Sequence, residues 1–326
     1  MYVAEPKISI ITPSFNQGAY LEETINSVIS QGYSNYELLI IDAGSTDNTI
    51  EVIRKYEQYI TYWVSEPDRG QSHAIQKGLE KATGDIINWI NSDDLLAPGA
   101  LHNIAREFDL EKYDVLCGYC DYFVNDLKHL DKRNERMWLG PSVGHTLVAC
   151  HINQPSTFFK AAILKNLGID EQYRYTMDVD LWYRYLLSAG MNKIKLSDKL
   201  LTYFRLHQSS KSVAEGSLFM GDNYKVFYNV LYSSNQHPVL LEFMKQKVSA
   251  FEQYKPTRYL VNVTDLQAFV RHHAWLAVHY YNEIRNYSAA RICLDIARSN
   301  GQPLDITVFR QMIKHYLIPS ALLRRM

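Results

Sequence analysis

The sequence predicts an α/β fold with a mostly parallel central sheet flanked by helices, followed by an all-helical C-terminal region. Three observations lead to this prediction. Short strand-like runs alternate with amphipathic helical segments over the first third of the chain, which is typical of right-handed crossovers between parallel strands. Polar clusters follow several of these strands, where ligands of parallel sheets bind. After about residue 212 the strand patterns give way to helical periodicity.

The N-terminal elements follow from hydrophobic periodicity. A short β-branched run, formed by Ile8, Ile10 and Ile11, ends at Pro13, and a helical face of apolar residues begins at Leu21. Tyr36–Asp42 (YELLIID) is expected to be a buried strand. The alternation then continues with a helix at 48–59, a strand at 61–65, a helix at 71–81, a strand at 85–91 and a helix from 98.

The remainder of the chain is less regular. Strands are expected at 114–124, 156–159 and 200–206, with a helix at 178–189, and the stretch 125–150 is expected to be an irregular loop over the site. The chain is therefore predicted to comprise a domain at 1–212 and a helical region at 213–326. Helices are expected in the second part at 218–232, 239–254, 265–281, 287–299 and 305–316.

The composition excludes several classes of protein. Of 326 residues, 47% are hydrophobic and 21% charged, as in folded globular chains. The formal net charge of -1 provides no field for nucleic acid. Neither a secretory signal nor an apolar run of about 20 residues is visible, so a cytoplasmic location is expected. Four cysteines are too few for a disulfide framework, and the Cys117 and Cys120 pair is expected to pack in a strand rather than bind zinc.

The sequence Asn91-Ser92-Asp93-Asp94 follows an apolar strand and carries two adjacent carboxylates. Such neighbours repel each other unless a cation joins them. Hard oxygen ligands suit Mg²⁺ or Mn²⁺, which keeps coordination positions for water and phosphate. The alternative is capping of the helix expected from Pro98, for which Asp94 is suited. The four residues alone do not separate the two interpretations.

Asp42 ends the second strand, before a turn in which Ser45, Thr46 or Asp47 is expected to cap the next helix. At the mouth of the sheet, the Asp42 carboxylate can accept an N–H of a base or a ribose hydroxyl.

Together these segments resemble glycosyltransferase family 2, the inverting nucleotide-sugar transferases with the GT-A fold. The resemblance covers residues 7–212 and lies in ISIITPSFNQGAYLEETINSVISQ, YELLIIDAGSTDNT, SEPDRGQSHAIQKGL, ATGDIINWINSDD, RYTMDVDLWYRYLLSAG and FRLHQSSKS. It implies a GT-A fold and transfer of a sugar from a nucleotide diphosphate sugar, with UDP favoured, to an acceptor hydroxyl. The absence of membrane helices and of a QxxRW segment favours one sugar per encounter.

The resemblance also implies a donor site. The implied nucleotide contacts are Thr12, Pro13 and Ser14 in the base pocket, Asp42 on the uracil-type edge, Asp68 and Gly70 at the border, and Ser92 and Asp93 beside the diphosphate. Asp93 matches the last acid of the DXD motif and would hold Mn²⁺ or Mg²⁺, with His207 closing over the metal. Asn91 stands where the first Asp usually is, and Gln76 replaces a usual Asn.

Asp178 matches the general base of the family, with Met177 in place of a common Glu. An acceptor hydroxyl attacks only as its proton is removed, and the metal neutralises charge on the departing diphosphate. Asp180 is expected to be a solvated or capping acid, and Arg205 or Lys211 to meet phosphate charge. Residues 154–156 resemble an acceptor-side segment.

Two other functions are open. A sugar-1-phosphate nucleotidyltransferase would need a glycine-rich, basic loop after the first strand, where this chain has Thr-Pro-Ser-Phe-Asn. An inactive glycan-binding or scaffold protein is suggested by Asn91 and Gln76. The acceptor is expected to be a glycan or a lipid-linked oligosaccharide of surface polysaccharide synthesis. Apolar and basic residues in 308–326 suggest peripheral contact with the inner face of the plasma membrane, or a terminal helix docked on the preceding hairpin.

Overall fold

The computed structural model describes residues 5–208, 210, 215–248 and 250–317. The chain forms two compact units. Unit 1 comprises Met1–Met137, Ile152–Trp182 and Asn192–Gly216, and unit 2 comprises Trp138–His151, Tyr183–Met191 and Ser217–Met326. The predicted boundary at 212 lies outside the described residues, so the division into 1–212 and 213–326 stays a prediction.

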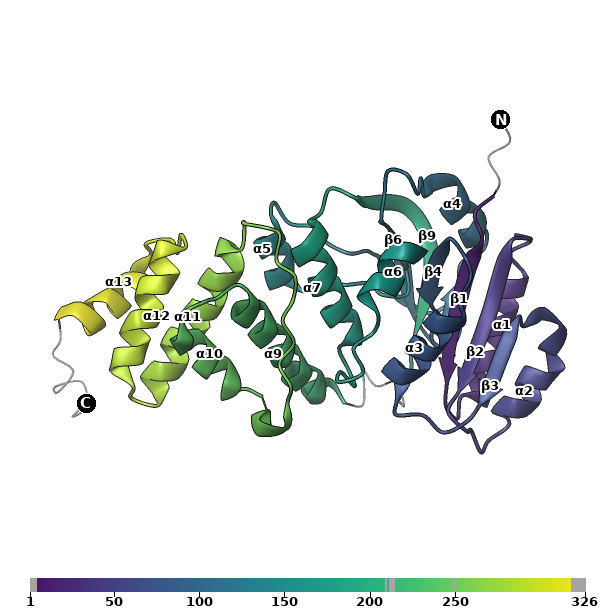
Figure 1. Ribbon diagram of the computed structural model, residues 1–326, viewed down its shortest axis with the longest axis horizontal. Helices are drawn as coiled ribbons and strands as arrows, with labels where there is room; N and C mark the ends of the chain where they lie inside the picture. The colour runs from purple at the N-terminus through teal and green to yellow at the C-terminus, as the bar shows by residue number, and fades with distance from the viewer. Residues whose placement is uncertain (1–4, 209, 211–214, 249, 318–326) are drawn as a thin grey trace. The chain divides into compact units, whose positions relative to one another are not determined.

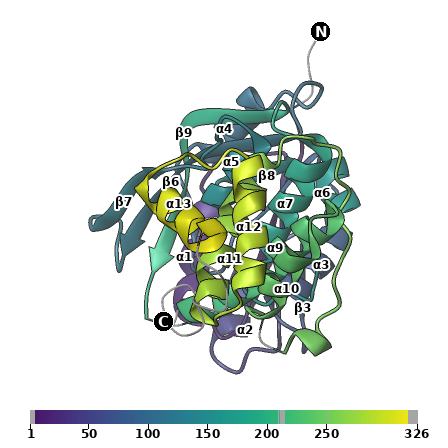
Figure 2. The same ribbon diagram turned by 90° about the vertical axis from the view of Figure 1, so that its left-hand side faces the viewer.

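Unit 1 contains the central sheet (Figure 1), which has nine strands among the described residues, in the order β3-β2-β1-β4-β8-β6-β9-β5 with β7 beside β6. Figure 2 shows β7 next to β6, with which it pairs in antiparallel orientation. The strands are β1 Ile8–Ser14, β2 Tyr36–Asp42, β3 Tyr62–Ser65, β4 Ile86–Trp89, β5 Leu95–Leu96, β6 Val115–Val124, β7 Leu130–Glu135, β8 Thr157–Lys160 and β9 Ile194–Leu206.

The sheet is mixed, which corrects the prediction that it is mostly parallel. Strands β1 to β4 pair in parallel, as their alternation with helices predicts. Strand β8 runs antiparallel to both β4 and β6, and β5 runs antiparallel to β9. The strict strand-helix alternation stops after β4, so nothing requires the later strands to share one direction.

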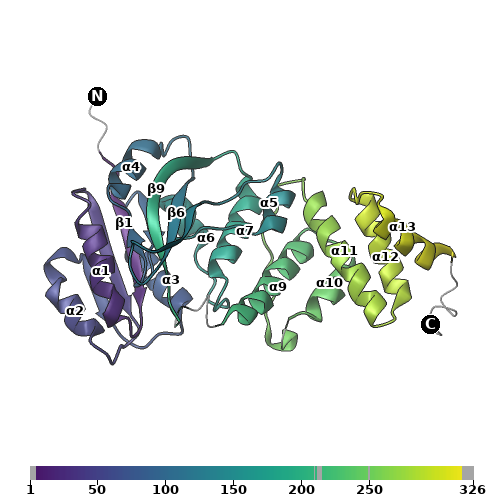
Figure 3. The same cartoon turned by 180° about the vertical axis from the view of Figure 1, so that it is seen from behind.

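Helices pack on both faces of the N-terminal strands (Figures 1 and 3). Ile8 and Ile10 join a buried cluster with Leu21 of α1 (Gly18–Ile29) and with residues of α2 (Thr49–Lys55) and α4 (Ala100–Glu107). Ile11 points to the opposite face, because side chains alternate along a strand. There it meets α3 (Gln71–Lys81), in which a Cβ on Gly78 would lie 2.3 Å from Ile11 Cγ2.

The stretch 125–150 is more regular than expected. It contains β7 and a helix, α5 (Val143–Ala149), whose N-cap Ser142 accepts the N–H of His145. Helix α6 (Ala161–Leu167) follows β8, and α7 (Met177–Ala189) lies at the predicted position. Cys117 and Cys120 are free, buried residues of β6, so the prediction of strand packing is confirmed.

Unit 2 is helical. Its helices beyond residue 216 are α9 Gly216–Ser233, α10 Pro238–Lys245, α11 Gln267–Glu283, α12 Tyr287–Ser299 and α13 Ile306–Met312, which continues into a π turn at Ile313–Leu317. Helices α11 and α12 lie side by side as a hairpin (Figures 1 and 3). Small buried residues such as Ala274, Ala277 and Ala290 let their backbones approach. In the described part of the chain, no helix is long and apolar enough to cross a membrane.

Candidate active site

The turn after β4 separates the two adjacent carboxylates. Asp94 is fully buried, and its two oxygens accept the N–H of Arg205 at 3.0 Å and the side-chain amide of Asn91 at 3.1 Å. Burial, together with the charge of Asp93, raises the pKa of Asp94 well above its ordinary value. The N-cap of α4 is Gly99, so the interpretation of Asp94 as a helix cap is wrong.

Asp93 turns its carboxylate toward His207, at the end of β9. The distance from His207 Nε2 to Asp93 Oδ2 is 2.8 Å, and the two side chains are 10% and 18% exposed. The His207 ring also lies against Tyr20 of α1, with a centroid distance of 4.6 Å. The structure thus brings together two residues that are 114 positions apart in sequence.

The Asp93 and His207 pair fits a divalent cation whose coordination would be completed by substrate. Among the described residues, no group of three or more His, Cys, Asp or Glu side chains gathers in a way that could hold a metal ion. One carboxylate and one imidazole are acceptable ligands for Mn²⁺, and Mg²⁺ sites often use one or two carboxylates plus substrate phosphates. A metal at this pair would therefore depend on a bound diphosphate for its remaining ligands.

The end of β1 presents two buried hydroxyls without partners. Thr12 and Ser14 are 0% and 5% exposed, and neither hydroxyl has a hydrogen-bond partner in the part of the chain that the structure describes. They lie two positions apart on a strand, so they share one face of the sheet, on either side of Pro13. Because buried hydroxyls are normally satisfied, this pair is suited to meet polar groups of a ligand.

Asp42 lies beside Ser14 in the sheet register but is turned into its own loop. Its side chain is fully buried and accepts hydrogen bonds from the N–H groups of Gly44 and Ser45 and from the hydroxyls of Ser45 and Ser65. The carboxylate therefore fixes the turn after β2, and a base could bond to it only if one hydroxyl were released.

The N-cap of α2 is Asn48, so the expectation that Ser45, Thr46 or Asp47 is the cap is wrong, but Asp47 still bonds to the start of this helix. Its carboxylate accepts the N–H of Thr49, the first residue of α2, and the N–H of Gly18, the first residue of α1. One side chain thus connects the starts of two helices.

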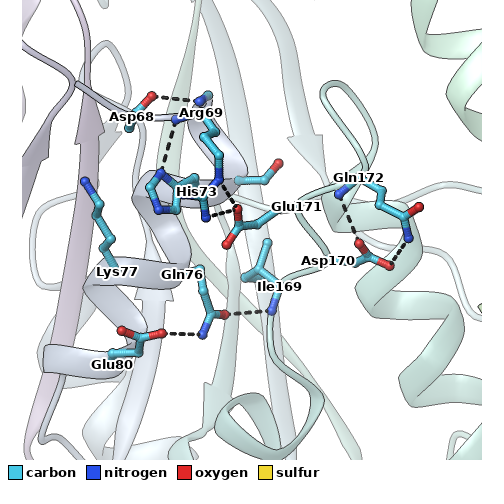
Figure 4. A network of polar contacts seen from close by, with 12 residues as sticks. Asp68, Arg69, His73, Gln76, Lys77, Glu80, Ile169, Asp170, Glu171 and Gln172 are labelled. Atoms are coloured by element: carbon cyan, nitrogen blue, oxygen red, sulfur yellow. Dashed lines mark hydrogen bonds and ion pairs between the residues drawn. The ribbon is translucent and has the colours of Figure 1, made fainter. Parts of the chain in front are cut away.

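The loop between β3 and α3 is held by a polar network (Figure 4). Asp68 Oδ1 accepts the N–H of Gly70 at 2.7 Å, and Gly70 has a φ of 116°, which favours glycine. Arg69 donates to Glu171 at 2.6 Å, across to the segment that leads into α7. Gln76 accepts the N–H of Ile169 at 3.0 Å, so its longer side chain holds the same segment.

Asp178 lies in the first turn of α7 and is partly exposed. Burial by surrounding atoms raises its pKa to about 6, although the N–H of Val179 donates to its Oδ1 at 2.9 Å and acts in the opposite direction. Asp180 is fully buried, so the expectation that it is solvated is wrong.

The surroundings of the Arg205 side chain differ from those expected of a residue that meets phosphate charge. Its side chain is only 3% exposed, and its guanidinium contacts Glu23 and main-chain carbonyls rather than open solvent. Lys211 lies outside the described residues. Three residues of α1 that were not predicted from the sequence, Tyr20, Glu23 and Thr24, also contact the site. Their spacing places them on one helical face, which is a usable signal.

Comparisons with known proteins identify relatives. Residues 9–167 match the family model described as Glycosyl transferase family 2. An uncharacterized glycosyltransferase of Rickettsia typhi is 29% identical over 216 residues, covering 63% of this chain and 65% of that protein. The matched region therefore spans just under two thirds of the length of that relative.

Two solved structures establish the fold. S. aureus TarS 1–349 in complex with UDP-GlcNAc has a TM-score of 0.57 at 16% identity and covers 91% of this chain and 89% of that one. The mannosyltransferase PcManGT from Pyrobaculum calidifontis in complex with GDP-Man and Mn²⁺ has a TM-score of 0.51 at 15% identity, with 99% and 83% covered. The predicted α/β fold of the GT-A type, with C-terminal helices, is confirmed.

Proposed function

Because this chain belongs to glycosyl transferase family 2 through residues 9–167, we propose that it transfers one sugar from a nucleotide diphosphate sugar to an acceptor hydroxyl, with inversion. The observation that carries the proposal is the contact between Asp93 and His207 at the carboxyl edge of the parallel strands. This is where ligands of such sheets bind.

Asp93 and His207 are the residues that would hold Mn²⁺ or Mg²⁺. When bound, the cation neutralises the charge that develops on the departing diphosphate. Mn²⁺ accompanies GDP-Man in the mannosyltransferase named above, which supports a metal here. Asn91 is not assigned to the metal, because it brings no negative charge and its side chain is oriented by a bond to Asp94 and one from Gln71.

The donor is proposed to be a UDP-sugar. Thr12 and Ser14 would offer their unpartnered hydroxyls to the nucleoside, with Pro13 between them. Asp42 would shape the base pocket and bond to the base after an exchange with a loop hydroxyl. Asp68, Gly70 and Ser92 would border the nucleotide. The UDP-GlcNAc bound to TarS supports the choice of uridine.

Asp178 is proposed to be the general base. A carboxylate with a pKa of about 6 is ionised at neutral pH and accepts a proton more readily than an ordinary aspartate. A single base that activates the acceptor hydroxyl opposite the leaving group gives inversion at the anomeric carbon.

The acceptor is proposed to be a glycan or a lipid-linked oligosaccharide, reached at a membrane surface. Val308 and His315 are buried, whereas Phe309, Ile313 and Leu317 are 51%, 37% and 74% exposed. The terminal helix is thus docked through one face and presents apolar side chains on another. Co-sedimentation with anionic vesicles but not with zwitterionic ones would support this contact. Equal recovery in the supernatant with both would refute it.

The test of the activity is release of nucleoside diphosphate from a panel of UDP-, GDP- and TDP-sugars, with Mn²⁺ and with simple glycan acceptors. We expect release from a UDP-sugar to require metal, to disappear in Asp93→Ala, and to fall about 10²–10⁴-fold in Asp178→Asn. Asp198→Asn is the matched control, since this side chain is 86% exposed.

Other outcomes distinguish the alternatives. Release of pyrophosphate from a nucleoside triphosphate and a sugar 1-phosphate would identify a nucleotidyltransferase. Donor binding by calorimetry without turnover on any acceptor would identify a binding protein. Either result would overturn the proposed transfer.

A further inference from the structure

Arg205 is a buried cation with an unusually complete set of partners. Its Nε donates to the carbonyl oxygen of Asp93 at 2.9 Å, one Nη donates to the carbonyl oxygen of Asn125 at 3.1 Å, and the other donates to Glu23 Oε2 at 2.7 Å. Its backbone N–H donates to Asp94 Oδ1 at 3.0 Å. A buried charge is tolerated only with such compensation, so these partners fix the guanidinium in one orientation.

Aromatic rings enclose the same guanidinium. Its central carbon lies 4.5 Å from the ring centroid of Phe123 and 5.1 Å from that of Tyr20. Tyr20 also contacts the ring of His207, with a centroid distance of 4.6 Å. Arg205 and His207 therefore share one aromatic neighbour, which ties the end of β9 to helix α1.

Thr24 holds the same turn. Its hydroxyl lies 2.9 Å from the carbonyl oxygens of both Ser92 and Asp94. With the bond from Arg205 to the carbonyl of Asp93, three consecutive carbonyls of the turn are in contact with buried donors. The backbone of the turn is thus fixed by side chains of α1 and β9.

We infer that Arg205 is a positioning residue, which together with Thr24 fixes the turn at 92–94 so that the Asp93 carboxylate is held against His207. This inference rests on the proposed function, because it concerns the pair that would hold the metal. It also accounts for a cation that does not face solvent: the guanidinium N–H groups already donate to protein oxygens and are not aimed at a phosphate.

Arginine is suited to this position where lysine is not. The planar guanidinium donates in several fixed directions at once, whereas the ammonium of lysine is a compact point charge. Arg205→Lys should therefore keep the charge beside Glu23 but lose at least one of the carbonyl contacts. Loss of groups that orient metal ligands typically weakens metal affinity about 10–100-fold.

The test compares full-length wild type with Arg205→Lys and, as a matched control, Arg136→Lys. Arg136 makes similar contacts away from the site: it donates to the carbonyl of Ser197 at 3.0 Å and to Asp198 at 2.9 Å, and it lies over the ring of Tyr119. Mn²⁺ binding is measured by calorimetry with UDP present, and Mn²⁺ dependence by UDP release.

We expect the Mn²⁺ concentration for half-saturation to rise about 10–100-fold in Arg205→Lys, with kcat restored at saturating Mn²⁺, and to stay unchanged in Arg136→Lys. Thr24→Val provides a second route should Arg205→Lys fail to fold. Its Mn²⁺ concentration for half-saturation should also rise. Thr24→Ser keeps the hydroxyl, so it should retain the Mn²⁺ dependence of the wild type.

Folded Arg205→Lys or Thr24→Val with the Mn²⁺ dependence of the wild type would overturn the inference. A loss of kcat that persists at saturating Mn²⁺ would also overturn it, since Arg205 would then act on the reacting groups. A wild-type protein that shows no Mn²⁺-dependent binding of UDP would instead refute the metal site of the proposed function.

Discussion

Replacing the proposed base Asp178 by asparagine should make the folded protein more stable at alkaline pH while removing activity. Burial raises the pKa of Asp178 from 3.8 to about 6. A difference of about two pH units corresponds to about 3 kcal/mol at about 1.36 kcal/mol per unit. The side chain is partly exposed, and solvent screening reduces the effect, so we expect about 1–2 kcal/mol.

The sign follows from proton linkage. The folded chain binds the proton of Asp178 more tightly than the unfolded chain, so the stability of the wild type falls as pH rises between about 4 and about 6. The penalty is fully present above pH 6 and absent below the unfolded pKa. Asparagine carries no charge, so Asp178→Asn avoids the penalty throughout this range.

Urea unfolding at pH 8 and at pH 4 measures this difference. We expect Asp178→Asn to gain about 1–2 kcal/mol relative to the wild type at pH 8 compared with pH 4, with Asp198→Asn changing by less than about 0.5 kcal/mol at either pH. The quantity compared is the free energy of unfolding of Asp178→Asn minus that of the wild type. A value that is the same at both pH values, or lower at pH 8 than at pH 4, would refute this reasoning. Such a gain in stability with a loss of activity is the trade-off expected of a functional residue.

Two further predictions concern stability. Burial alone would raise the pKa of Glu37, but hydrogen bonds, first of all from Lys7, outweigh it and lower the pKa to about 2. Glu37→Gln should therefore cost about 2–3 kcal/mol at pH 7 in urea unfolding, and this cost should disappear as pH falls from about 4.5 to about 2. An equal cost at pH 7 and pH 2 would contradict the assignment. Gly78→Ala should destabilise the protein by about 1–3 kcal/mol, because its Cβ would lie 2.3 Å from Ile11. Gly221→Ala in α9, where a Cβ meets nothing within 4 Å, should instead raise the free energy of unfolding by up to about 1 kcal/mol. If thermal unfolding showed that both alanine variants are stabilised, or that both are destabilised, the packing argument would fail.

The predictability of the fold differs between its two halves. Strands β1 to β4 and helices α1 and α3 were predicted because uninterrupted apolar runs and amphipathic helices determine them locally. The antiparallel direction of β8 and the pairing of the ten-residue strand β6 with β8 and β9 depend on partners far away in sequence. A short run such as Thr157–Lys160 has the same periodicity in either direction, so sequence alone could not decide it.

The candidate site was predicted where a residue type is chemically unusual and missed where it is ordinary. Asp93 and His207 stand at strand ends, where a carboxylate and an imidazole are conspicuous, and the structure places them 2.8 Å apart. Which of the two adjacent carboxylates is buried could not be predicted, because one residue of offset in a turn exchanges their environments. The structure buries Asp94 against Arg205 and Asn91 and leaves Asp93 accessible.

Helix α1 shows why supporting residues escape sequence analysis. Tyr20, Glu23 and Thr24 recur at the spacing of one helical face, next to the apolar face formed by Leu21 and Ile25. Such a polar face ordinarily contacts solvent, yet here Thr24 is fully buried and Glu23 is paired with a buried arginine. A threonine next to an apolar stripe is a poor choice for a solvated helical surface, since β-branching lowers helix propensity. Its presence there is explained by the two carbonyl oxygens that its hydroxyl contacts, so a β-branched hydroxyl residue at the edge of an apolar helical face is a signal for a contact with a functional turn.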